Sequence, residues 1–62
     1  MIAEYEIKNV RILEDFLNKE IGTEYDSNQC KPFLDGYITV FDITIKEHKK
    51  IKDFIKKSNL RL

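Results

Sequence analysis

The sequence predicts a small α+β domain with two layers, in which two helices pack on one face of a short sheet. Two stretches are typical of strands: residues 3–8 alternate apolar and charged side chains, and residues 36–43 are rich in β-branched and aromatic residues. Two others, residues 10–21 and 45–57, repeat apolar residues at helical spacing. A chain of 62 residues has room for one core, so we expect a single domain, residues 1–62, with the order β-α-(β)-β-α.

The first strand and the first helix follow each other directly. Ala3, Tyr5 and Ile7 alternate with charged residues, which predicts a strand with one buried face. Asn9 is a good N-cap residue, and Gly22 suits the left-handed position that follows a helix. Between them runs a stripe of apolar residues at helical spacing: Val10, Leu13, Leu17 and Ile21.

The middle of the chain is less regular. Residues 23–35 are rich in turn formers and contain Pro32, which favours a loop with at most a short edge strand. The strand at residues 36–43 has apolar side chains on both faces, which suggests a central position. If it runs parallel to the first strand and beside it, the connection between them must cross over with a right hand.

The second helix begins with a capping box, because Thr44 is followed three residues later by Glu47. Its apolar stripe consists of Ile51, Phe54 and Ile55. Six lysines fall outside this stripe. The last residues, 60–62, could return to an edge of the sheet.

Cys30 is the only cysteine and His48 the only histidine, which excludes an internal disulfide and a four-ligand zinc site. We therefore expect no metal and no cofactor, with stability from packing and self-association. A single cysteine and an alternating first segment, residues 1–8, favour the cytoplasm. No stretch approaches the roughly 20 apolar residues that cross a bilayer, so we expect no membrane insertion.

Self-contained catalysis is not expected, and no catalytic residue is assigned. A nucleophilic pair of Cys30 and His48 is conceivable, but neither residue sits in a catalytic motif, so a loop thiol and a half-exposed histidine are the simpler interpretation. Neighbouring carboxylates such as Glu4 and Glu6 are best read as a solvated face. An enzyme subunit completed across a dimer interface stays an open alternative.

The first helix has more apolar residues than one stripe needs. Ile12 and Phe16 stand four positions apart, to the side of the stripe. A thin two-layer domain cannot bury both sides of a surface helix, so we interpret Ile12 and Phe16 as part of a protein interface. Because small domains often need a partner subunit, we expect a homodimer.

Although the net charge is zero, the acidic and basic residues are separated along the chain. Residues 1–45 carry a net charge of −5, and residues 46–62 carry +5. Lys49, Lys52 and Lys56 are therefore candidate contacts to an acidic partner or to nucleic acid. Nucleic-acid binding is the less favoured of the two, because proteins that read nucleic acid usually use stacking aromatics and arginines, which are scarce in this helix.

Together these features predict a small non-enzymatic protein-binding module, a regulator or inhibitor that acts as a homodimer with a protein partner. Abundant lysine and isoleucine without tryptophan are typical of AT-rich genomes. Small stand-alone regulators are common on phages and other mobile elements, so we expect such an origin.

Overall fold

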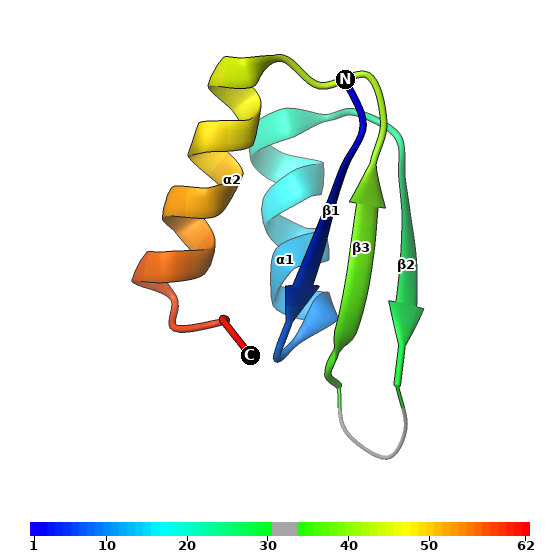
Figure 1. Cartoon of the computed structure of the whole chain (residues 1–62), viewed down its shortest axis with the longest axis vertical. Helices are drawn as coiled ribbons and strands as arrows, with labels where there is room; N and C mark the ends of the chain where they lie inside the picture. Colours follow the sequence, from blue (N-terminus) through cyan, green and yellow to red (C-terminus); the bar gives the residue numbers. More distant parts are fainter. Residues whose placement is uncertain (31–33) are drawn as a thin grey trace.

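The structure is a computed structural model that describes residues 1–30 and 34–62; Pro32, part of the predicted loop, lies outside these residues. Figure 1 shows the predicted order of strands and helices, with the optional strand present. The elements are β1 (Ala3–Ile7), α1 (Val10–Phe16), a π-helical segment η1 (Leu17–Ile21), β2 (Tyr25–Gln29), β3 (Gly36–Val40) and α2 (Ile45–Lys57).

β3 is the central strand of an antiparallel sheet with the order β1-β3-β2. Ile38 in the middle of β3 pairs with Tyr5 of β1 on one side and with Ser27 of β2 on the other. β1 and β3 are neighbours, but they run in opposite directions, so the handedness rule for parallel strands does not apply. The central position predicted for the strand after Gly36 is confirmed.

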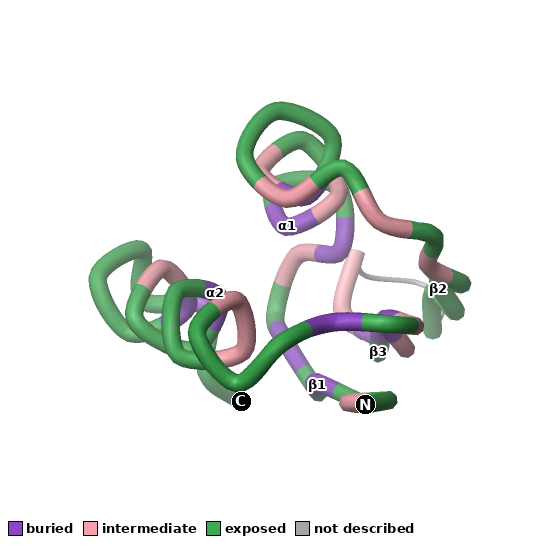
Figure 2. Tube along the Cα trace, turned by 90° about the horizontal axis from the view of Figure 1, so that it is seen from above, coloured by how far each residue is buried: buried purple, intermediate pink, exposed green. Residues whose placement is uncertain are grey.

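Both helices pack on one face of the sheet, as predicted, and Figure 2 shows α1 and α2 on the same side of the three strands. The core lies between the two layers. Its buried apolar side chains are Tyr5, Ile7, Val10, Leu13, Leu17, Ile38, Val40, Ile43, Ile51, Ile55 and Leu60. On the uncovered face, alternate residues such as Glu4, Glu6 and Asp26 are exposed.

The first helix begins and ends where the sequence predicts, but its last part is not an α-helix. Oδ1 of Asn9 accepts hydrogen bonds from two backbone N–H groups of the first turn. From Leu17 the helix widens into η1, and the N–H of Gly22 donates to the carbonyl of Leu17 at 2.7 Å. Gly22 has a φ of 76°, the left-handed conformation predicted for it.

β3 is shorter than the predicted strand at residues 36–43. The chain turns at Asp42, which has a positive φ of 54°. Ile43 follows this turn and is buried in the core, although simple alternation placed it on the same face as Tyr37. Tyr37 is 37% exposed on the uncovered face, so only one face of β3 is buried.

α2 starts with the predicted capping box. The N–H of Thr44 donates to Oε1 of Glu47 at 2.9 Å, and the N–H of Glu47 donates to Oγ1 of Thr44 at 3.1 Å. Ile51 and Ile55 then bury the inner side of the helix against the sheet.

After α2 the chain returns to β1. The N–H of Lys8 donates to the carbonyl of Leu60 at 2.8 Å, and Ile7 forms an isolated antiparallel bridge with Arg61. The predicted return of residues 60–62 to an edge of the sheet is confirmed.

Candidate binding surfaces on the two sides of the second helix

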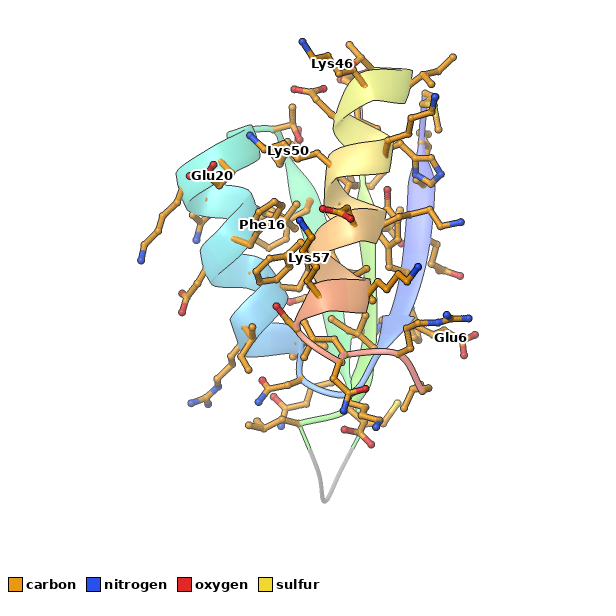
Figure 3. The ribbon with its side chains drawn as sticks, turned by 90° about the vertical axis from the view of Figure 1, so that its left-hand side faces the viewer. Glu6, Phe16, Glu20, Lys46, Lys50 and Lys57 are labelled. Atoms are coloured by element: carbon orange, nitrogen blue, oxygen red, sulfur yellow. The ribbon has the colours of Figure 1, made fainter. Side chains whose placement is uncertain are left out.

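α2 separates two surfaces, one toward α1 and one toward β1. Nζ of Lys50 lies 3.4 Å from Oε1 of Glu20, at the end of the first helix. Figure 3 shows Lys50, Glu20 and Phe16 on this side of α2 and Glu6 on the other side. The lysines of α2 therefore do not form one uniform face.

The surface toward α1 is a hollow of about 440 Å³, here called the inter-helix groove. It is lined by Ile12, Asp15, Phe16, Lys19, Glu20 and Phe54. The rings of Phe16 and Phe54 stack with centroids 4.1 Å apart and planes 14° from parallel. Ile12 is 43% exposed beside them, which gives the groove an apolar floor and a charged rim.

The structure brings both predicted interface residues, Ile12 and Phe16, into this groove. Phe16 is half-buried and has a partner within the chain, because Phe54 lies flat against it. The premise that a two-layer domain cannot cover this side of the first helix is therefore wrong for Phe16. It holds for Ile12. The sequence placed Phe54 in the apolar stripe of the second helix and did not show that its ring would also contact Phe16.

The surface toward β1 is a hollow of about 480 Å³, here called the cationic cleft. It is lined by Tyr5, Glu6, Lys49, Lys52, Asp53, Ile55, Lys56 and Arg61. The three predicted contact lysines, Lys49, Lys52 and Lys56, all line this cleft. The tail adds Arg61, which sequence reasoning did not include, because only the return of the tail to the sheet places it there.

The cations of the cleft differ in their pairing from two other lysines of α2, Lys50 and Lys57. Lys50 is paired with Glu20, and Lys57 is paired with Asp53 at 3.1 Å. Within residues 1–30 and 34–62, by contrast, none of the four cations of the cleft is in an ion pair. Glu6 and Asp53 offset part of this charge, so the cleft has an excess of two positive charges.

Tyr5 and His48 close the inner wall beside the cleft. The Tyr5 hydroxyl lies 2.6 Å from Nδ1 of His48, and the two rings stack with centroids 5.6 Å apart. Burial raises the pKa of the Tyr5 hydroxyl to about 12. The hydroxyl therefore stays protonated at neutral pH and can donate a hydrogen bond to Nδ1.

Cys30 has different surroundings from His48. It is exposed just after β2, where its N–H donates to the carbonyl of Asp35 at 2.7 Å across the end of the β2–β3 hairpin. His48 lies near the start of α2 and contacts Tyr5. The structure therefore does not bring the thiol and the imidazole together.

Within the described part of the chain, no group of three or more His, Cys, Asp or Glu side chains is arranged to hold a metal ion. None of the helices described is long and apolar enough to span a bilayer. Comparison of the chain with protein-family models, with curated proteins and with solved structures gives no match.

Proposed function

We propose that this chain is a non-enzymatic protein-binding module, a small regulator or inhibitor, that forms a homodimer through the inter-helix groove. The observation that carries the proposal is Ile12, a large apolar side chain left 43% exposed beside the Phe16–Phe54 stack. Action in the cytoplasm and an origin on a phage or mobile element belong to the same proposal.

The rim of the groove supports a second copy as its occupant. Asp15, Lys19 and Glu20 place both signs of charge around an apolar floor. In a two-fold dimer the same surface serves both subunits, so Lys19 of each copy can face Asp15 of the other. Burying Ile12 would contribute at most roughly 1.5 to 3 kcal/mol per copy, enough to support a weak dimer when combined with the ring faces.

The test is the molar mass in solution, measured by light scattering after size exclusion at high micromolar concentration. We expect the wild type to be a dimer and Ile12→Glu to be a monomer. Ile45→Glu is the matched control, because Ile45 is 66% exposed at the start of α2, outside the groove. A monomeric wild type, or an Ile12→Glu variant that stays dimeric, would contradict the homodimer.

Phe16 is a poor choice for this test. Its ring packs on Phe54, so Phe16→Glu would remove an internal contact and place a charge against the core. Loss of the dimer in that variant could then reflect unfolding rather than a lost interface.

Nucleic-acid binding is the second candidate function, favoured by the convergence of Lys49, Lys52, Lys56 and Arg61 in one cleft. Neutralised phosphates would release counterions and give affinity without sequence preference. Glu6 in the cleft and the exposed acids of the sheet oppose a polyanion. We therefore expect no detectable binding of mixed-sequence DNA or RNA at physiological salt.

Submicromolar binding of DNA or RNA at physiological salt would make nucleic-acid binding the favoured function. In that case Lys49→Gln, Lys52→Gln and Lys56→Gln together should flatten the salt dependence by about one unit for each lost phosphate contact.

A further inference from the structure

The face of the sheet that the helices leave uncovered is formed by alternate residues of all three strands. Thr39 of β3 pairs with Glu4 of β1 on one side and with Asp26 of β2 on the other, so these side chains form one row across the sheet. The next row consists of Glu6, Tyr37 and Asn28. In Figure 2 both helices lie on the other side of the strands. We call this surface the acidic sheet face.

The centre of the acidic sheet face, along β3, is aromatic. Tyr37 is 37% exposed there. The N–H of Phe41 donates to the carbonyl of Glu24 at 3.0 Å, so the pairing of β3 with the chain before β2 continues beyond Val40. By alternation, Phe41 lies on the same face as Tyr37. It is half-buried, and within the described residues it is not among the side chains packed on the core.

The two sides of the acidic sheet face carry negative charge. Glu4 and Glu6 of β1 are exposed on one side, and Glu24 and Asp26 are exposed on the other. None of the three strands contains a lysine or an arginine. In the part of the chain that the structure describes, none of these four carboxylates is in an ion pair. Glu6 also borders the cationic cleft, so the other three belong to this face alone.

We infer that the acidic sheet face binds an amphipathic basic helix of a partner protein. The apolar stripe of this helix lies on Tyr37 and Phe41, and lysines or arginines on both sides of the stripe face the acids of the two outer strands. The inference rests on the proposed function in one respect, that the chain is a protein-binding module. It uses a different surface from the inter-helix groove.

The dimensions of the sheet suit a helix. Neighbouring strands lie about 4.8 Å apart, so the acids on β1 and β2 are about 10 Å apart, which is close to the width of a helix with its side chains. β3 has 5 residues. A strand of this length spans about 17 Å, which equals about 11 residues, or three turns, of a helix. A helix along β3 can therefore place cations beside the acids on both sides.

Other occupants suit this face less well. Nucleic acids and anionic lipids would be repelled by its carboxylates. Among the described residues, no group of three or more His, Cys, Asp or Glu side chains could hold a metal ion. A second copy offers the lysines of α2, but Ile51 and Ile55 of that helix are buried in its own core. It therefore presents no apolar stripe to Tyr37, and we assign a helix of another protein.

The first experiment compares three synthetic peptides of about four helical turns, all acetylated and amidated. The first has a leucine stripe with lysines on both sides and alanine elsewhere. The second has the same composition in an order that does not separate leucine from lysine, and the third has glutamate in place of lysine. We expect the first to bind at least about tenfold more tightly than the others, measured by titration calorimetry at physiological salt. No binding of the first, or equal binding of either control, would overturn the inference.

Matched variants of the protein locate the charge contacts. Glu4→Gln/Asp26→Asn removes two charges with little change of shape, and the glutamine can still accept the hydrogen bond from Oγ1 of Thr39. This variant should weaken binding of the first peptide by about fivefold or more. Asp15→Asn/Glu20→Gln removes the same charge from the rim of the inter-helix groove and should have a much smaller effect. Equal losses, or a larger loss in the groove variant, would overturn the assignment to the sheet.

Tyr37→Thr tests the aromatic centre of the face. Threonine keeps the β-branched shape that suits a strand but offers less apolar surface. We expect this variant to bind the first peptide about tenfold more weakly, with a circular dichroism spectrum like that of the wild type. Unchanged affinity would show that the peptide does not lie along β3 and would overturn the inference.

Nuclear Overhauser effects between peptide and protein give an independent readout. We expect contacts from the leucines of the first peptide to the Tyr37 ring and to the methyl group of Thr39. The methyl groups of Ile12, in the inter-helix groove, should show none. Contacts to Ile12 in place of Tyr37 would move the peptide to the groove and overturn the assignment.

The dimer and the helix site can fail separately. Ile12→Glu lies in the inter-helix groove, away from the acidic sheet face, and should leave peptide binding unchanged. A monomeric wild type that binds the first peptide contradicts the homodimer alone. A dimer that does not bind it contradicts the helix site alone.

Discussion

Tyr5 links protonation of its hydroxyl to the stability of the fold. Its side chain is 7% exposed in the core, and its hydroxyl is hydrogen-bonded to His48. Burial raises its pKa from 10.0 to about 12, because the phenolate would lose its hydration. At a pH between these two pKa values, the Tyr5 hydroxyl keeps its proton in the folded chain and loses it in the unfolded chain.

The sign of the effect on stability follows from this difference. The contribution of Tyr5 is fully present below pH 10 and is lost as the pH rises toward 12. Allowing for solvent screening, we expect a loss of at most about 1 to 2 kcal/mol. Urea unfolding at a series of alkaline pH values measures it.

Tyr5→Phe should remove this part of the alkaline loss. The variant should also be less stable at neutral pH by about 1 kcal/mol, since it lacks the hydrogen bond to His48. Tyr37→Phe, on the uncovered face of the sheet, is the control and should keep the alkaline loss. If the wild type and Tyr5→Phe lose the same stability between pH 10 and 12, Tyr5 is not the group responsible.

Individual residues were predictable where chemistry acts locally. Asn9, Gly22 and Thr44 have the capping or turn roles that their residue types favour. The stack of Phe16 on Phe54 was not predictable, because it depends on how far apart the two helices lie on the sheet. The place of Arg61 in the cationic cleft depends in the same way on tertiary contacts.

At the scale of elements, the two glycines make different demands on the chain. Gly22 has a left-handed backbone, and a Cβ there would meet nothing within 4 Å. Gly36 lies at the start of β3, where a Cβ would overlap the backbone carbonyl of Asn28 in β2. Gly22 is therefore required by its backbone angles, and Gly36 is required by the short distance between β3 and β2.

We therefore expect Gly36→Ala to destabilise the domain more than Gly22→Ala. Overlap with a neighbouring strand should cost about 2 to 3 kcal/mol, because the two backbones must separate. The left-handed strain at Gly22 should cost about 1 kcal/mol. Urea unfolding followed by circular dichroism compares the two; a larger effect at Gly22 would show that β2 yields easily to the added methyl group.

Element types were predictable to a greater degree than element lengths. β2 was foreseen only as an optional strand, because its polar sequence lacks the alternation of a buried strand. All of its residues from Asp26 to Gln29 are exposed, so pairing with β3 rather than burial accounts for it. The π-helical segment η1 could not be predicted, because the spacing of the apolar residues over this segment is that of an ordinary α-helix.

At the scale of the whole molecule, the charge separation along the sequence becomes a separation in space. The uncovered face of the sheet carries Glu4, Glu6 and Asp26, and α2 carries the lysines. The direction of β1 relative to β3 was not predictable, because a strand pattern states which face is buried but not which neighbour is paired. The two-layer packing was predictable, since two amphipathic helices and one-sided strands leave few other ways to form a core.

The position of β1 also has a consequence for the order of folding. β2 and β3 are joined by a short connection, whereas Ile7 pairs with Gly36 and Ala3 with Val40, across a large part of the chain. Pairs that are distant in sequence must overcome a larger loss of chain entropy before they contribute. We expect Ile7→Val, at a buried site in β1, to speed unfolding and leave the folding rate nearly unchanged in stopped-flow experiments. A slower folding rate would instead place β1 in the folding nucleus. If the folding rate is unchanged, β1 is the last strand to join the sheet. The edge of the sheet that β1 forms is then present only once the rest of the domain has folded.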